Sequence, residues 1–153
     1  MKQKRLFVAI RIHPNEQFLR LYYQLKKALQ HDRINWVKEE NIHVTLKFIG
    51  KTPEDRIDEI ISAVEDACLD ISPFELALEG LGIFGSRYNP RAIWFGIRKE
   101  PMLISLAHNV LQEMENIGYE KDRQNFVPHL SIGRVKLLED KNYFQQTIDK
   151  HKP

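Results

Sequence analysis

One cysteine, no long hydrophobic run and a charge balance close to zero exclude several classes of protein. Cys68 is alone, so no internal disulfide can form and a reducing compartment is favoured. The apolar stretch near the N-terminus ends at Arg11, which makes it too short for a signal peptide or a membrane span. The formal net charge of +2 falls short of the basic stripe of proteins that wrap long nucleic acids. We therefore expect a cytoplasmic protein with no membrane partner, in which a small or terminal phosphate remains a suitable ligand.

The 153 residues, of which 42% are hydrophobic and 29% charged, are typical of one compact globular domain. Alternating apolar residues predict strands, and apolar residues at helical spacing predict helices. Thr52 is the candidate N-cap of the second helix. The order predicts an α+β fold with two similar halves. The pattern indicates strands at 5–12, 43–50, 73–85, 91–98 and 126–135, and helices at 14–31, 51–70, 101–117 and 140–150.

Two of the predicted strands carry the same arrangement of a histidine and a hydroxyl. The sequence is HVTL at 43–46 and HLSI at 129–132. Alternate residues of a strand share a face, so His43 lies beside Thr45 and His129 beside Ser131, with apolar residues on the opposite face. Each strand therefore offers an imidazole and a hydroxyl side by side.

This pairing of side chains suits phosphodiester chemistry without a metal. A histidine titrates near neutrality, so one imidazole can act as a base while another acts as an acid. Hydroxyl groups can donate hydrogen bonds to the non-bridging oxygens of a phosphate and stabilise the charge of the transition state. One histidine would remove a proton from the attacking water or sugar hydroxyl, and the other would protonate the departing oxygen.

The two motifs and their surroundings resemble a known family. The chain is similar to the RNA 2′,3′-cyclic phosphodiesterase branch of the two-histidine phosphoesterase superfamily, whose members are also called 2′-5′ RNA ligase-like or LigT-like proteins. The resemblance covers nearly the whole chain. It is carried by RLFVAI at 5–10, EENIHVTLKFIG at 39–50, FGSRYNPRAIWFGI at 84–97 and FVPHLSIGR at 126–134.

This resemblance implies a bilobal, pseudo-symmetric α+β fold. Two largely antiparallel sheets would line a central groove, with the helices on the outside and the two motifs facing each other. We expect a single two-lobed phosphoesterase domain over 1–153 and a monomer. Such proteins usually continue into another strand where this chain ends, so the domain is expected to lack a C-terminal strand. The second motif has Ser131 where threonine is commoner in the family, which keeps the hydroxyl.

The resemblance also implies an activity and a role for each histidine. The expected substrates are RNA ends or small nucleotides with a 2′,3′-cyclic phosphate, which would be opened to a 2′-phosphate without a cofactor or metal. A related reaction joins RNA ends through a 2′-5′ linkage. By analogy, His43 is the proton donor to the leaving 3′ oxygen, and His129 is the proton acceptor that activates water. The sequence itself does not assign these roles, because the two motifs are nearly symmetric. Thr45 and Ser131 would bind the phosphate.

Two cations are weaker candidates for substrate binding. Lys47 shares strand parity with His43 and could reach a phosphate. An exposed, solvated lysine is an equally good interpretation of this position. Arg134 has the wrong parity relative to His129 in a regular strand. It could help only if Gly133 permits a bulge or the strand ends there, although the family often has arginine at this place.

Four aromatic residues could stack on a nucleobase, but core packing is favoured for most of them. They are Phe48, Phe84, Trp94 and Phe126. The sequence leaves two rival hypotheses open. The first is a non-catalytic module that binds RNA or nucleotides in the same groove, and the second is a metal-dependent phosphodiesterase. No third ligand stands at a recognisable short spacing from the two histidines, which disfavours the second rival.

Overall fold

The computed structural model describes residues 2–122 and 126–153, which form two compact units assembled from alternating segments of the chain. The first unit comprises the described parts of 1–10, 45–76 and 99–127, and the second unit comprises 11–44, 77–98 and 128–153. Both histidine strands begin in the second unit. Within the described ranges, no helix has the length and apolar character that crossing a membrane requires.

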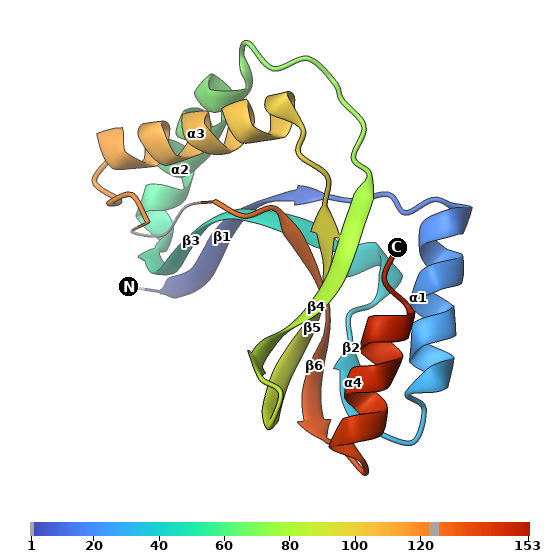
Figure 1. The fold of residues 1–153 in the computed structure, drawn as a ribbon. Helices are drawn as coiled ribbons and strands as arrows, with labels where there is room; N and C mark the ends of the chain where they lie inside the picture. The colour runs from blue at the N-terminus through green and yellow to red at the C-terminus, as the bar shows by residue number, and fades with distance from the viewer. Residues whose placement is uncertain (1, 123–125) are drawn as a thin grey trace. The chain divides into compact units, whose positions relative to one another are not determined.

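The second unit is built on a four-stranded antiparallel sheet (Figure 1). Its two middle strands are joined to edge strands on either side, and the predicted pairing of 73–85 with 91–98 is confirmed. Ser86 pairs with Asn89, so Arg87 and Tyr88 form a tight two-residue turn. The strand order is β2 (Arg33–Trp36), β6 (His129–Leu137), β5 (Asn89–Ile97) and β4 (Leu78–Ser86).

Helices α1 (Glu16–Ala28) and α4 (Lys141–Lys150) cover one face of this sheet (Figure 1). Phe18 of α1 packs edge-on against Phe95 of β5, with 5.5 Å between ring centroids. Phe144 of α4 is completely buried. The apolar residues of β5 and β6 therefore point toward the helices, and we call the opposite side the helix-free face.

The first unit combines a two-stranded sheet with a pair of helices. Strands β1 (Gln3–Arg11) and β3 (His43–Pro53) form the sheet, and helices α2 (Ile57–Cys68) and α3 (Pro101–Asn116) contact each other. Asn109 of α3 donates a hydrogen bond to the carbonyl of Ala67 at the end of α2, at 3.2 Å. Gly118, with a φ of 103°, lies just beyond α3, where a glycine stop is predicted.

The α+β class and the antiparallel sheets are confirmed, whereas three local predictions are wrong. Strand β2 is missed, because four residues are too few to show an alternating pattern. Strand β3 continues past Gly50 to Pro53, so Thr52 lies in the strand and is not an N-cap. Its buried hydroxyl donates to the carbonyl of Gly50 at 2.9 Å. Residues 73–77 lie outside strand β4, which begins at Leu78.

Candidate active site

The register between β5 and β6 decides which side chains share the helix-free face. His129 lies opposite Gly96, and Ser131 lies opposite Trp94. The next pair in register on the same face joins Arg134 to Ala92. Between Ser131 and Arg134, β6 has one residue more than β5, which is a β-bulge. His129, Ser131 and Arg134 therefore lie on one face.

The extra residue of the bulge is accommodated on the helix side of the sheet. Ile132 is completely buried, and Gly133 lies against the side chains of β2. A Cβ atom at Gly133 would come within 2.9 Å of Ile34 Cγ2 and 3.3 Å of Trp36 Cε3. The condition under which Arg134 could join the site, a bulge at Gly133, is thus met.

His129 contacts two aromatic side chains, one on the adjacent strand β5 and one on β4, the strand beyond it. Its imidazole meets Phe84 of β4 edge-on, with 5.1 Å between ring centroids and an interplanar angle of 77°. Trp94 of β5 lies 6.4 Å from the same imidazole, at 63°. Phe84 is 44% exposed and Phe48 is 72% exposed, so the preference for core packing is wrong for these two rings.

The backbone before β3 orients His43. The Nδ1 atom of His43 lies 2.7 Å from the carbonyl oxygen of Asn41, at the end of a short 3₁₀ turn (Glu39–Asn41). A carbonyl oxygen can only accept, so Nδ1 carries the hydrogen and donates it. The Nε2 atom is therefore the position at which His43 gains or loses a proton.

Contacts from α1 and β6 hold the segment that leads to His43. The hydroxyl of Tyr22 donates to the carbonyl of Val37 at 2.5 Å, and Tyr23 hydrogen-bonds the carboxylate of Glu39. Val37 in turn donates its N–H to the carbonyl of Ile132 in the bulge of β6, at 2.9 Å. Burial, and then the charges of Tyr23 and Glu39, raise the pKa of Tyr22 to about 12. The hydrogen bond to Glu39 raises the pKa of Tyr23.

Lys47 is not a solvated lysine, which is one of the two equal alternatives that the sequence leaves open for it. The side chain is buried, with 7% of the residue exposed. Its Nζ atom lies 2.7 Å from Asp122 Oδ1 and 2.7 Å from the carbonyl oxygen of Glu120. These partners belong to the first unit and satisfy the ammonium group, so we assign Lys47 a structural role and leave it out of the candidate site.

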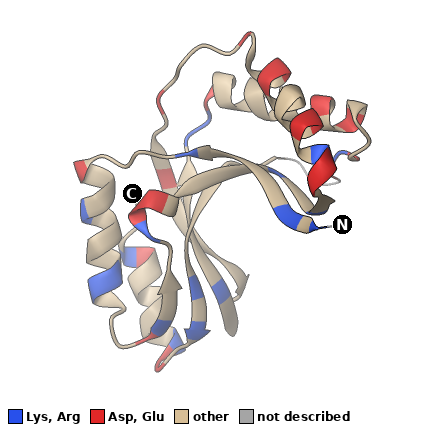
Figure 2. Cartoon of the chain, turned by 180° about the vertical axis from the view of Figure 1, so that it is seen from behind, with Lys and Arg blue, Asp and Glu red and all other residues tan. Residues whose placement is uncertain are grey.

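The charges of the second unit favour an anionic ligand on its sheet. The four strands carry the cations Arg33, Arg91, Arg134 and Lys136, against the single carboxylate of Glu79. Figure 2 shows Lys and Arg on these strands and Asp and Glu concentrated on α2 and α3 of the first unit. Over 2–122 and 126–153, no group of three or more His, Cys, Asp and Glu side chains is placed to hold a metal ion.

Comparisons with known proteins identify relatives along nearly the whole chain. The family described as LigT-like phosphoesterases matches residues 10–94. A protein of Methanocaldococcus jannaschii named RNA 2′,3′-cyclic phosphodiesterase is 33% identical over 97% of this chain and 81% of its own. A protein of Archaeoglobus fulgidus with the same name is 31% identical over 86% of this chain and 73% of its own.

Solved structures show the same fold at lower sequence identity. A protein of Thermus thermophilus aligns with a TM-score of 0.75 and 23% identity, over 90% of this chain and 77% of its own. The Escherichia coli protein LigT, crystallised with 3′-AMP, aligns with a TM-score of 0.62 and 22% identity, over 91% of this chain and 78% of its own. These two likenesses confirm the arrangement of strands and helices.

Proposed function

This chain belongs to the family of LigT-like phosphoesterases, and from that premise we propose that it is an RNA 2′,3′-cyclic phosphodiesterase. The names of the M. jannaschii and A. fulgidus relatives support this activity. The observation that carries the proposal is the bulge of β6, which gathers His129, Ser131 and Arg134 on one face of the sheet. An imidazole can transfer a proton, and a hydroxyl and a guanidinium can bind the phosphoryl oxygens during phosphodiester cleavage.

In the proposed reaction, water attacks the phosphorus atom of a 2′,3′-cyclic phosphate. The imidazole of His129 takes a proton from the water as the new P–O bond forms. The bond from phosphorus to the 3′ oxygen breaks, and His43 donates a proton from Nε2 to that oxygen. Thr45, Ser131 and Arg134 bind the non-bridging oxygens and offset their growing charge. The product carries a 2′-phosphate.

Several finer points of the hypothesis stay predictions. The roles of His43 as proton donor and His129 as acceptor follow the family analogy. RNA ends, or small nucleotides that carry the cyclic phosphate, are the proposed substrates. A cytoplasmic monomer and a single two-lobed domain over 1–153 are expected from the sequence.

The test is hydrolysis of each 2′,3′-cyclic mononucleotide in the presence of EDTA. We expect a 2′-phosphate product, and we expect His43→Ala and His129→Ala each to lower kcat by about 10²- to 10⁴-fold. His108→Ala is the matched control, because His108 is exposed on α3 and should leave turnover unchanged. Circular dichroism checks that each variant is folded.

Four results would count against this hypothesis, each in a different way. A 3′-phosphate product would contradict the proposed bond cleavage. Full activity in both His43→Ala and His129→Ala would remove the two histidines from the mechanism. Tight binding of the cyclic nucleotide without turnover would favour the non-catalytic binding module, and loss of turnover in EDTA would favour the metal-dependent rival.

A further inference from the structure

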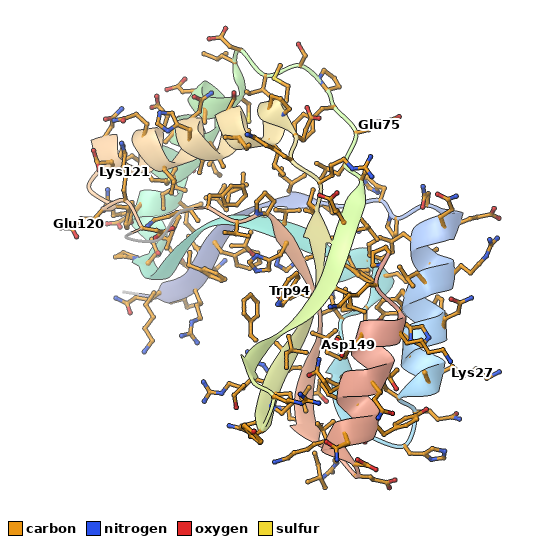
Figure 3. All side chains as sticks on the ribbon, viewed as in Figure 1. Lys27, Glu75, Trp94, Glu120, Lys121 and Asp149 are labelled. Carbon is orange, nitrogen blue, oxygen red and sulfur yellow. The ribbon has the colours of Figure 1, made fainter. Side chains whose placement is uncertain are left out.

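The indole of Trp94 occupies space that a side chain on the neighbouring strand would otherwise fill. Trp94 lies on β5 and Gly82 lies opposite it on β4. A Cβ atom at Gly82 would lie 2.4 Å from Trp94 Cζ2, 2.8 Å from Cη2 and 2.9 Å from Cε2, all of which are prohibitive distances. Figure 3 shows the Trp94 side chain on the side of the sheet away from α1 and α4. The absence of a side chain at Gly82 therefore permits the observed position of the indole.

Packing contacts hold this indole in place. Its Nε1 atom is buried and has no hydrogen-bond partner among the residues that the structure describes. A hydrogen bond would fix the orientation of the ring, but packing contacts fix it only while the neighbouring volumes stay the same. Gly82 does not have a positive φ, so alanine suits its backbone and would act only through the added methyl group.

The same indole belongs to a cluster of three rings that includes His129. Trp94 lies 6.0 Å from Phe84 and 6.4 Å from the imidazole of His129, between ring centroids. Phe84 lies on β4 and His129 on β6, so their 5.1 Å contact passes over β5, the strand that carries Trp94. We therefore expect a shift of the indole to displace one or both of the other rings.

We propose that Trp94, seated on Gly82, is a positioning residue that, together with Phe84, holds the imidazole of His129 at the place required for proton transfer. The expected effect on kcat rests on the proposed function. The expected effect on the position of the His129 imidazole does not. Proton transfer depends steeply on geometry, and a misplacement of about 1 Å can cost about a hundredfold in rate. Aromatic packing contacts position the ring without adding a charge beside it.

The test compares Trp94→Phe and Gly82→Ala with the unmodified chain. Each variant should lower kcat at least about tenfold and leave KM for a 2′,3′-cyclic mononucleotide within about twofold. Because both act through one ring, the double variant should be no slower than Trp94→Phe alone. If the loss in kcat of the double variant equals the two single losses multiplied together, the proposal is overturned.

The second measurement does not depend on turnover. The long-range ¹H–¹⁵N spectrum of the histidines, with His129 assigned from His129→Ala, should show the His129 signals displaced in both variants. Tyr143→Phe is the matched control, because Tyr143 is an exposed aromatic residue of α4, on the helix side of the same sheet. It should leave kcat and the His129 signals unchanged.

The two measurements separate this proposal from the proposed function. Unchanged His129 signals in Trp94→Phe would overturn the positioning role even if His129→Ala is inactive. Displaced signals together with full activity in His129→Ala would support the packing role and refute the mechanism. Circular dichroism identifies an unfolded variant, and Trp94→Phe remains decisive if Gly82→Ala does not fold.

Discussion

Tyr22 links a helix to the segment that presents His43, through one hydrogen bond to the carbonyl of Val37. The ring is nearly fully buried in the second unit. Its hydroxyl must stay protonated to donate this bond, which agrees with the raised pKa of about 12. A single residue thus couples the stability of the fold to the position of a proposed catalytic group.

The pKa of Tyr22 gives this residue a defined pH dependence. The ordinary pKa of a tyrosine is 10.0, and the pKa of Tyr22 in the folded protein is about 12. The unfolded chain therefore loses this proton at lower pH than the folded protein does. The stability contributed by Tyr22 is fully present below about pH 10 and is lost as the pH rises through about 12.

We therefore expect Tyr22→Phe to cost about 1 kcal/mol near pH 8, since the carbonyl of Val37 loses its donor. The variant should also lose less stability than the unmodified chain between about pH 8 and about pH 11. Urea unfolding followed by circular dichroism at both pH values measures this. Tyr88→Phe is the control, because Tyr88 is exposed on the turn between β4 and β5. If Tyr22→Phe and the unmodified chain lose the same stability between these two pH values, the raised pKa of Tyr22 is contradicted.

At the scale of elements, two buried or half-buried cations hold the segment that follows α3. Lys47 of β3 binds Asp122 and the carbonyl of Glu120. Arg56 donates to the carbonyl of Ile117 at 2.5 Å, and its guanidinium lies 4.7 Å from the ring of Tyr119. The segment from 117 to 122 is therefore held to β3 and to the start of α2.

Removing only the anion of the Lys47–Asp122 pair should lower the stability of the fold more than removing both charges does. Asp122→Asn leaves the buried ammonium without a counter-ion, and we expect a loss of about 1 kcal/mol, because the Asp122 side chain is 50% exposed. Adding Lys47→Met to Asp122→Asn should recover part of this loss. Urea unfolding measures both variants. Asp149→Asn, which breaks an exposed pair with Lys152, should change stability by less than about 0.5 kcal/mol. A double variant less stable than Asp122→Asn would refute this account.

For the molecule as a whole, the chain alternates between two units, so each unit is complete only when segments from distant parts of the chain are present. Each unit takes three separate segments, and β6, an inner strand of the four-stranded sheet, comes from the last of them. A fragment of residues 1–98 keeps β4 and β5 but loses the strand that joins them to β2.

We expect this fragment not to fold, because β5 would expose Ile93 and Phe95, which are completely buried in the whole chain. The measurement is the dispersion of amide signals in a ¹H–¹⁵N spectrum, together with far-ultraviolet circular dichroism. Removal of residues 152–153, which are exposed, is the matched control and should leave the spectrum unchanged. A well-dispersed spectrum for residues 1–98 would contradict the expectation.

Local pattern accounts for the parts of the fold that sequence reasoning predicts well. Helix α3 at Pro101–Asn116 agrees with the predicted 101–117, because its apolar spacing and Gly118 are both local signals. The face shared by His129 and Ser131 follows from strand alternation alone. Phe48 shows the limit of the same rule, since it has the same strand parity as the core residues Val44 and Leu46 of β3 and is nevertheless exposed.

The amino-acid sequence by itself determined the α+β class, the family and the two motifs at His43 and His129, because composition, periodicity and short motifs are properties of neighbouring residues. Only the tertiary structure decided that Arg134 joins the face of His129, because a bulge depends on the strands that pack on either side of it. It also decided that Lys47 binds Asp122 and that His129 contacts Phe84 and Trp94. These partners are far apart along the chain, and no local pattern encodes which of them meet.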